Sequence, residues 1–598
     1  MTRARPASGL LPALIAYYQR LKTAPNQTVA DFGFSVEKIH AQVVLGPDGS
    51  LVDLQDIREP GARGKPAPRS LLVPDGGGRQ GTGLKPFFCW DNTGYALGRD
   101  TKGNPERANA MFAAFRDLHL SLRDELADDE GFAALCRFLD RWDPVGAEPP
   151  SNWDELAGLN VVFKLRGRPG YVHQSERVRA AWLRRSASDA QDGSGQVGYS
   201  LVDGEQDELA RLHPSISGVV GANTMGAAIV SFNLNAFESY GKSQSFNAPV
   251  GVHDAFRYTT ALNRLLADDA RRVRIGDATV VFWSDRDEGG EAEETFSQIF
   301  GEDVPRENEA EHRATVDRVR AFLDAARRGR LADRLADPDA PFYILGLSPN
   351  ASRLNVRYWL AGTVHEFAER LAEHVERLEM TGARPDAPPL IIRRLLLETA
   401  REPKDIPPQL AGEVARAVLG GLRYPRALFT AIVRRVRVDS RVNHIRAAIL
   451  KTFLIRNIGM EVPVALDKDH PDEAYQLGRL FAALEFAQTN ALGDLNKSVK
   501  DSYFGAAAAT PSIVFPRLLK LHHHHVEKLP TNSEDARSEK KRTKGYFDRL
   551  DQEIIGRIGQ FPRYLPLERQ GLFYIGYFHQ RQAFFTKKAE ETKETSDE

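Results

Sequence analysis

Two glycine-containing polar segments hold the side chains whose chemistry best suits contact with nucleic acid. In the first, residues 75–86, glycines let the backbone approach a phosphate closely, and the side chains supply hydrogen-bond donors. These donors are Arg79, Gln80, Thr82 and Lys85. Arg or Lys can pair with guanine in the major groove, and Gln can pair with adenine. The alternative interpretation is a flexible loop with incidental basic residues.

The second segment, residues 239–249, gathers hydroxyl and amide side chains around Lys242. Gln244 and Asn247 are of the types that read base edges or hold phosphates. Asn also satisfies backbone groups at turns, so both interpretations stay open. The Gly-Lys-Ser sequence at 241–243 resembles a phosphate-binding loop, but Ala236 stands where that loop requires glycine. Nucleotide hydrolysis is therefore not indicated.

Two clusters of basic residues are suited to following a nucleic-acid backbone. The first comprises Arg434, Arg435, Arg437, Arg441, Arg446, Lys451 and Arg456. The second comprises Lys540, Lys541, Arg542 and Lys544, in a loop suited to contact single-stranded DNA. Solvation of an ordinary helical bundle explains the first cluster nearly as well, and an interhelical linker explains the second somewhat better.

The residue types that support catalysis or metal binding are not arranged in a recognisable motif. Two cysteines, Cys89 and Cys136, are too few for a thiolate metal site and fit a reducing compartment, which predicts a cytoplasmic protein. The histidine run 522–525 cannot converge on one ion from a helix, because consecutive residues point about 100° apart. Asp467, Asp469 and Asp472 fit helix capping as well as metal binding. We expect no catalysis, no metal and no cofactor.

Length and composition indicate a multidomain chain with packed cores. The chain has 598 residues, which suggests about three to four domains, and 42% of them are hydrophobic. No stretch approaches the roughly twenty apolar residues of a membrane span. The pattern of residues 9–22 predicts an amphipathic first helix rather than a signal peptide. The net charge is −1, so a DNA-binding surface would have to be local.

The first half of the chain mixes strand and helix patterns. Residues 35–45 alternate apolar and polar side chains before a Gly-Pro-Asp-Gly turn, which predicts a β-hairpin with the segment from Leu51. Residues 104–142 have helical spacing, and a strand-rich part is expected over 159–283, with a surface loop at 186–198. An acidic linker is expected over 286–310, followed by a strand that begins at Pro341.

From about residue 355 the pattern becomes helical, with leucines and other apolar residues at core-forming spacing. The predicted fold class is therefore α+β, with an N-terminal mixed α/β domain containing antiparallel strands and a C-terminal helical bundle. The predicted domains are residues 1–355, with a possible division near 150, then a helical connecting region at 356–470, and the bundle at 471–598.

Eight segments spread over the chain together resemble the large subunit of the type I-C CRISPR Cascade. They are LPALIAYY (11–18), LVP (72–74), CWDNTGYALG (89–98), VSFNLNAFESYGK (230–242), YTTALN (258–263), ILGLSPNASR (344–353), AYQLGRLF (474–481) and QGLFYIGYFHQ (570–580). Each segment alone is weak evidence, but their order and coverage make the resemblance specific.

The resemblance implies a non-catalytic subunit of a crRNA-guided complex. In that family the N-terminal domain contacts the protospacer-adjacent motif of double-stranded target DNA and promotes R-loop formation, and a recruited helicase-nuclease cleaves. The implied partners are crRNA and the backbone, crRNA-processing and small subunits, with no membrane. Asn92, in the third segment, joins the candidate DNA-binding residues. The alternatives are a metal-dependent nuclease and a purely structural assembly subunit.

The resemblance also concerns the C-terminal bundle, which is expected to resemble the separate small subunit. In this family, that subunit is translated from within the same reading frame. Met460 is a possible internal start.

Overall fold

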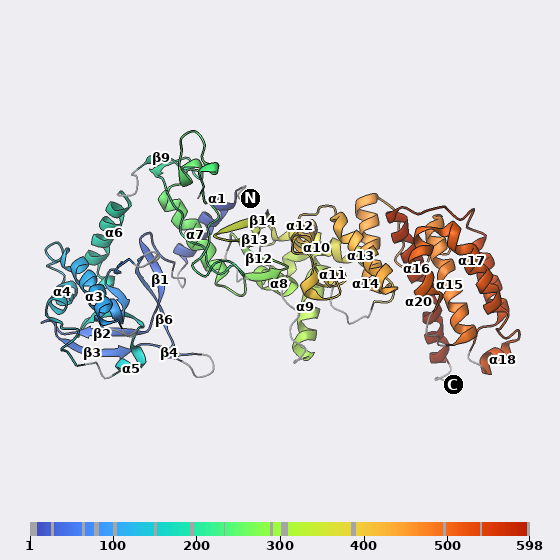
Figure 1. Cartoon of the computed structure of the whole chain (residues 1–598), viewed down its shortest axis with the longest axis horizontal. Coiled ribbons are helices and arrows are strands. Elements are labelled where there is room, and N and C mark those ends of the chain that lie inside the picture. Colours follow the sequence, from blue (N-terminus) through green and yellow to red (C-terminus); the bar gives the residue numbers. More distant parts are fainter. Residues whose placement is uncertain are drawn as a thin grey trace. The chain divides into compact units, whose positions relative to one another are not determined.

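The computed structural model describes residues 9–24, 29–61, 66–76, 83–99, 104–148, 152–191, 196–232, 234–286, 291–300, 309–335, 337–383, 390, 392–493, 498–538 and 541–594. The chain divides into two compact units, each with its own hydrophobic core (Figure 1). We call residues 8–217 with 223–264 the N-terminal unit, and residues 218–222 with 265–598 the C-terminal unit. The three-part division expected from the sequence stays a prediction.

A four-stranded mixed sheet with strand order β3-β2-β8-β7 forms the centre of the N-terminal unit. β2 (Ala41–Leu45) is antiparallel to β3 (Leu51–Asp56) and parallel to β8 (Asn160–Leu165), which pairs with β7 (Trp90–Asn92). The predicted hairpin is thus confirmed. Every residue of β2 is buried. Aromatic side chains of α3 (Pro105–Leu120) and α4 (Glu130–Arg141) share the core of this sheet.

Smaller elements complete the N-terminal unit. They are α1 (Leu10–Thr23), β1 (Phe34–Ile39) paired with β6 (Arg69–Pro74), β4 (Glu59–Pro60) paired with β5 (Pro66–Ala67), α2 (Thr93–Ala96), α5 (Trp153–Leu156), α6 (Glu176–Gln191), β9 (Val197–Tyr199) paired with β10 (Gln206–Glu208), and α7 (Val252–Leu266). The predicted first helix and the helices within 104–142 are confirmed.

Two sequence-based expectations for this unit were wrong in part. α6 continues to Gln191 where a surface loop was expected from residue 186. In the first part of this helix Val178 and Ala181 are buried and Trp182 donates a hydrogen bond to the Gly33 carbonyl, so packing supports the helix from there. The region 159–283 is also less strand-rich than expected, because residues 209–251 form mostly turns and isolated bridges.

The C-terminal unit begins with an antiparallel sheet in the order β11-β12-β13-β14. Its strands are β11 (Arg272–Ile275), β12 (Ala278–Ser284), β13 (Pro341–Asn350) and β14 (Arg353–Thr363). Two helices, α8 (Glu291–Phe300) and α9 (Glu309–Arg327), lie between β12 and β13 in the chain and share the core of this unit with the sheet. Part of the expected acidic linker is therefore helical. The strand predicted at Pro341 is confirmed.

The rest of the C-terminal unit is helical, as predicted. Its helices are α10 (Val364–Arg377), α11 (Ile392–Leu397), α12 (Pro408–Leu419), α13 (Arg426–Asp439), α14 (His444–Phe453), α15 (Glu473–Leu492), α16 (Val499–Ala509), α17 (Pro511–Val526), α18 (Ser533–Ser538), α19 (Lys544–Ile555) and α20 (Leu567–Glu594). One hydrophobic core extends from Val273 to Phe584. The α+β fold class is thus confirmed.

None of the described helices is both long and apolar enough to cross a membrane.

α15 and α20 cross at very short range because each presents a glycine to the backbone of the other (Figure 1). A Cβ atom at Gly478 would lie 2.0 Å from the Phe573 carbonyl oxygen, and one at Gly576 would lie 2.1 Å from the Tyr475 carbonyl oxygen. No side chain fits at either position without moving backbone. These two glycines therefore fix both the distance and the register of the two helices.

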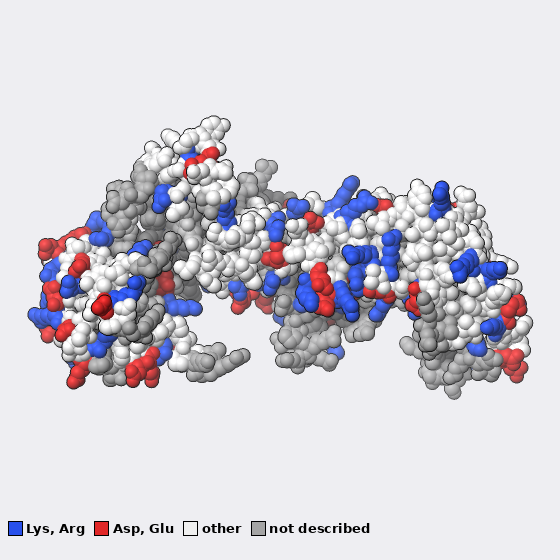
Figure 2. Space-filling view, viewed as in Figure 1, with Lys and Arg blue, Asp and Glu red and all other residues white. Residues whose placement is uncertain are grey.

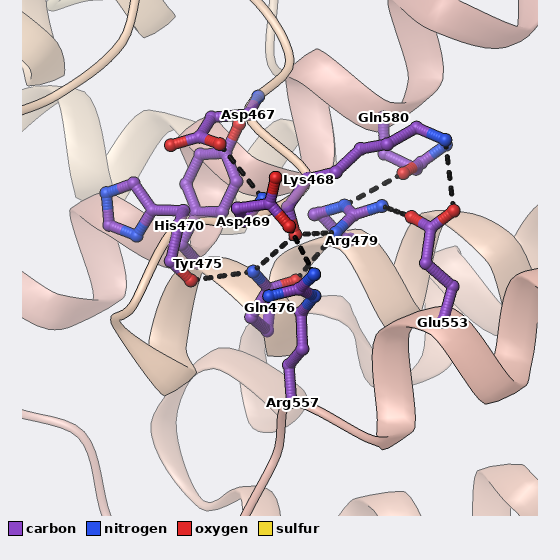
Figure 3. A network of polar contacts seen from close by, with 10 residues as sticks. All are labelled: Asp467, Lys468, Asp469, His470, Tyr475, Gln476, Arg479, Glu553, Arg557 and Gln580. Atoms are coloured by element: carbon purple, nitrogen blue, oxygen red, sulfur yellow. Dashed lines mark hydrogen bonds and ion pairs between the residues drawn. The ribbon is translucent and has the colours of Figure 1, made fainter.

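The same crossing buries a charged side chain among four hydrogen-bond acceptors (Figure 3). Arg479, which follows Gly478, has no exposed surface. Its guanidinium donates to Gln580 Oε1 (3.0 Å), the Lys468 carbonyl (2.8 Å), Gln476 Oε1 (2.8 Å) and Glu553 Oε1 (2.5 Å). A buried guanidinium is stable only with such partners. This network ties α15, α19, α20 and the segment before α15 to one another.

We predict that Gly478→Ala severely destabilises the C-terminal unit. The added methyl group has to displace the Phe573 backbone, and overpacking of this kind typically costs about 1–3 kcal/mol or more. Chemical denaturation followed by circular dichroism measures the effect. Gly412→Ala is the matched control, since a Cβ atom at Gly412 in α12 meets nothing within 4 Å. Alanine favours a helix interior there, so this control should be neutral or stabilising. Equal stability of the two variants would contradict the assignment.

Candidate nucleic-acid interface

The segment 239–249 of the N-terminal unit begins with a tight reverse turn. Ser239 and Lys242 form an antiparallel bridge, and the Lys242 N–H donates to the Ser239 carbonyl at 2.9 Å. The two residues between them have positive φ, 54° at Tyr240 and 68° at Gly241. Positive φ at both central positions is the mark of a type I′ turn, which favours Gly, Asn or Asp. Tyr240 is an unusual occupant of its position.

Asn247 holds this turn with its side-chain amide. Its Nδ2 donates to the carbonyl oxygens of Lys242 (2.8 Å) and Gln244 (2.9 Å), and its Oδ1 accepts from the Ser239 N–H at 2.9 Å. Gln244 Oε1 accepts a hydrogen bond from the Arg211 guanidinium at 2.8 Å. The structure thus brings the three predicted residues together, with the Asn247 amide engaged inside the loop and the Gln244 side chain bonded to Arg211 outside it.

Tyr240 and Lys242 form the exposed tip of this loop. The Tyr240 side chain is 99% exposed, and Lys242 is also exposed. Neither side chain has a hydrogen bond or ion pair to another described residue. Sequence reasoning selected Lys242 but missed Tyr240. The sequence does contain a signal for Tyr240: it is an aromatic residue immediately before glycine in an otherwise polar segment. No helical or strand pattern of apolar residues there would explain it as part of a core.

Only part of the first predicted segment lies within the described residues. Lys85 is exposed, and its backbone N–H donates to the Tyr95 hydroxyl at 3.2 Å, which anchors the end of the segment on α2. Asn92 caps the same helix, because its Oδ1 accepts from the backbone N–H groups of Gly94 (3.0 Å) and Tyr95 (3.4 Å). The amide oxygen of Asn92 thus has a structural role. The other predicted donors of this segment lie outside the described residues: Arg79, Gln80 and Thr82.

On α13 the two predicted arginines differ in their surroundings. Arg434 is exposed, and no described side chain pairs with it. Arg435 is half-buried, and its guanidinium bonds Asp439 at 2.7 Å. Asp439 also accepts from the buried Arg446 at 2.7 Å, so it lies between two guanidiniums. Arg435 therefore has an internal partner, and Arg434 is the one of the two that is available to an external anion.

Exposed cations continue along α13 and recur on α17 (Figure 2). Arg437 is exposed on α13 three residues after Arg434, and Arg441 is exposed two residues beyond the end of that helix. Arg517 and Lys520 are exposed on α17. We call these five residues the basic helix surface. Sequence reasoning missed Arg517 and Lys520, because single cations spaced along a helix form no run.

Helix α16 connects the two parts of the basic helix surface. A Cβ atom at Gly505 would lie 3.6 Å from the Arg437 side chain, and the Arg517 guanidinium lies 5.5 Å from the Tyr503 ring centre. Lys500, on the same helix, is half-buried, and this burial lowers the pKa of its ammonium group. The surface thus combines exposed guanidiniums with an aromatic ring, a combination suited to single-stranded nucleic acid.

The second predicted basic cluster, at residues 540–544, packs against the bundle where it is described. Lys540 lies outside the described residues. Lys541 and Arg542 are half-buried. The Arg542 N–H donates to Asn490 Oδ1 at 3.2 Å, and its guanidinium lies 5.4 Å from the Tyr546 ring centre.

Histidines and carboxylates considered as metal ligands have other partners. His522 Nε2 lies 2.6 Å from Asp551 Oδ2. Asp472 caps α15 and pairs with Arg569 at 2.8 Å, and Asp469 pairs with Arg557. Within the described part of the chain, no group of three or more His, Cys, Asp or Glu residues is placed to hold a metal ion.

A protein-family comparison spans nearly the whole chain. The model of the family described as CRISPR-associated protein (Cas_Csd1) matches residues 14–585. The chain belongs to the Csd1 family. This match confirms the resemblance to the type I-C large subunit. The Csd1 match includes both units, the Tyr240–Lys242 tip and the basic helix surface. No curated protein matches the chain.

We predict that Asn247→Ala loosens the turn at 239–242. The variant loses three hydrogen bonds, each worth about 1 kcal/mol, so amide exchange across residues 239–247 should accelerate by roughly tenfold or more. Hydrogen exchange with mass spectrometry measures this rate. Asn247→Asp keeps the acceptor but loses both donors, and should give an intermediate rate. Unchanged exchange in Asn247→Ala would show that the amide does not hold the turn.

Proposed function

We propose that this chain is the DNA-recognition subunit of a crRNA-guided Cascade complex of type I-C, and that it does not itself catalyse a reaction. The family match over residues 14–585 carries the proposal. In it, the N-terminal unit contacts the protospacer-adjacent motif in duplex DNA, and the C-terminal unit guides the separated strands. Its partners are crRNA, the other Cascade subunits, target DNA and a recruited helicase-nuclease that cleaves.

The exposed Lys242 supports the role of the N-terminal unit. Its ammonium group stands on a turn that Asn247 fixes with three hydrogen bonds, so the group is presented with little freedom of the backbone. A lysine presented in this way suits a phosphate, because backbone contacts position a protein on DNA before any base is read. Lys85 supplies a second exposed cation at the end of the glycine-rich segment.

The basic helix surface supports the role of the C-terminal unit. Arg434 and Arg437 lie three residues apart on α13, or about 5 Å along the helix axis, and Arg441 follows two residues beyond the end of the helix. Such a row of cations neutralises successive phosphates of one strand, and Tyr503 provides a flat ring for a base. The overall charge of −1 does not oppose this role, because the cations are concentrated locally.

The absence of catalysis in this proposal is supported by the partners of the carboxylates. Asp469 and Asp472, which a nuclease would need as metal ligands, have arginine partners, and Asp472 also caps a helix. A two-metal nuclease site requires clustered carboxylates free to bind cations.

A second candidate function is a purely structural assembly subunit. It is favoured by large apolar side chains that are exposed in the N-terminal unit, since such residues often mark protein interfaces. Tyr199 and Leu201 are each 71% exposed, and Leu212 is 62% exposed. These residues are compatible with both candidates, because a DNA-recognition subunit also contacts its neighbours in the complex.

We predict that Lys242→Gln weakens binding of the assembled complex to duplex DNA that carries the motif. Loss of one phosphate contact should reduce the slope of log Kd against log salt by about 1. Fluorescence anisotropy at several salt concentrations measures both quantities. Lys22→Gln is the matched control, because it removes the same charge from an exposed position in the same unit and should leave the slope unchanged. If both variants behave like the wild type, the structural candidate is favoured.

A separate prediction concerns the basic helix surface. The double variant Arg434→Gln, Arg517→Gln should weaken binding of the purified full chain to a single-stranded oligonucleotide by a few-fold at physiological salt, with a shallower salt dependence. Arg426→Gln serves as the control, since Arg426 already pairs with Glu568 at 2.8 Å. If the double variant and the control lose the same affinity for the oligonucleotide, then the overall charge of the chain, and not this surface, determines binding.

A further inference from the structure

We propose that the Tyr240 ring stacks on a nucleobase of the target DNA, while Lys242 contacts a phosphate beside that base. This inference rests on the proposed function and adds a base-contacting residue to it. The observation behind it is an aromatic side chain at a strained backbone position, almost completely exposed, at the tip of a turn that hydrogen bonds hold in place.

The backbone at Tyr240 is strained, and no hydrogen bond or ion pair of its side chain with the described residues compensates for the strain. A bulky side chain at φ 54° is unfavourable by roughly 1–2 kcal/mol relative to ordinary backbone. Glycine or asparagine would occupy this position of a type I′ turn at lower cost. The ring is 99% exposed, so packing against the rest of the protein does not repay this cost. A residue that violates the backbone preference of its position, with no stabilising contact in return, is expected at a functional position.

The turn presents the ring in a defined place. The three hydrogen bonds of Asn247 and the bond between Arg211 and Gln244 fix the backbone on one side of the tip. A tyrosine side chain has only two rotatable bonds, so its immobilisation on a partner costs little entropy. Its flat face matches any base, and stacking tolerates different sequences.

The charge next to the ring favours DNA over a protein surface as the partner. Lys242 is exposed two residues away, and the other side chains of the tip are small and uncharged, Ser239 and Ser243. Glu238 precedes the turn. A ring beside a cation meets both groups that a nucleotide offers, the base and the phosphate. A base that has lost its pairing partner exposes the π-face that the ring requires.

The test uses the assembled complex with crRNA and four variants. Tyr240→Phe keeps the ring, and Tyr240→Leu keeps an apolar side chain but loses the aromatic face. Tyr240→Gly removes the side chain and relieves the strain, so the loss of binding is not caused by a damaged turn. Lys242→Gln tests the phosphate contact. Native mass spectrometry checks that every variant complex has the same subunit composition.

We expect Tyr240→Phe to bind motif-containing duplex DNA within about twofold of the wild type, and Tyr240→Gly to bind about 5- to 150-fold more weakly, the range of one lost stacking interaction. Tyr240→Leu should resemble the glycine variant more than the phenylalanine variant. Wild-type affinity in Tyr240→Gly, with weakened binding in Lys242→Gln, would overturn the stacking role and leave the proposed function intact. Wild-type affinity in both variants would remove support for both.

A direct readout separates a base contact from a protein contact. Target DNA that carries 5-iodouracil at single positions next to the motif should form a photo-cross-link to the peptide containing Tyr240, and this product should disappear in Tyr240→Gly. A cross-link to crRNA instead, or a glycine variant that loses a subunit of the complex, would show that the ring contacts a different partner and would overturn the proposal.

Discussion

The close crossing of α15 and α20 is the constraint on which the C-terminal unit depends. Gly478 and Gly576 each face the backbone of the opposite helix, so the two helices can neither move apart without opening a void nor slide without a clash. This fixed register places Arg479 beside Gln580 and Glu553, which both accept hydrogen bonds from its guanidinium. Two segments that identify the family, AYQLGRLF and QGLFYIGYFHQ, contain these glycines, and their signature thus reflects packing.

The same helix positions the cations of the surface. α20 meets α13 and α14 through Gly571, where a Cβ atom would lie 2.7 Å from the Phe429 ring, and Gln570 accepts a hydrogen bond from Arg437. Arg437 is therefore held in place by its contact with α20. A surface that binds a flexible strand benefits from such a support, because its charges stay in place before the ligand arrives.

The candidate loop of the N-terminal unit divides its polar residues between two tasks. Asn247 forms hydrogen bonds inside the loop and Gln244 accepts one from Arg211 outside it, whereas Lys242 and Tyr240 remain at the surface. The same division separates Arg435, which pairs with Asp439, from the exposed Arg434. In both places the residues that could bind DNA were recognisable by type, but their availability depended on partners inside the protein.

The sequence alone determined the features that depend on local patterns: the β2–β3 hairpin, the helical second half, the α+β class and the family. The hairpin, the helices and the fold class follow from apolar periods and turn residues that act over a few positions, and the family follows from the resemblance of the eight segments. Only the tertiary structure decided that α6 continues as a helix to Gln191, that residues 209–251 form few strands, and which candidate side chains are free. Those outcomes depend on partners far away in the chain, such as Gly33 for Trp182 and Arg211 for Gln244. A hydrogen bond or a buried apolar face stabilises an element only when its partner is in place. Folding of the whole chain brings these partners together.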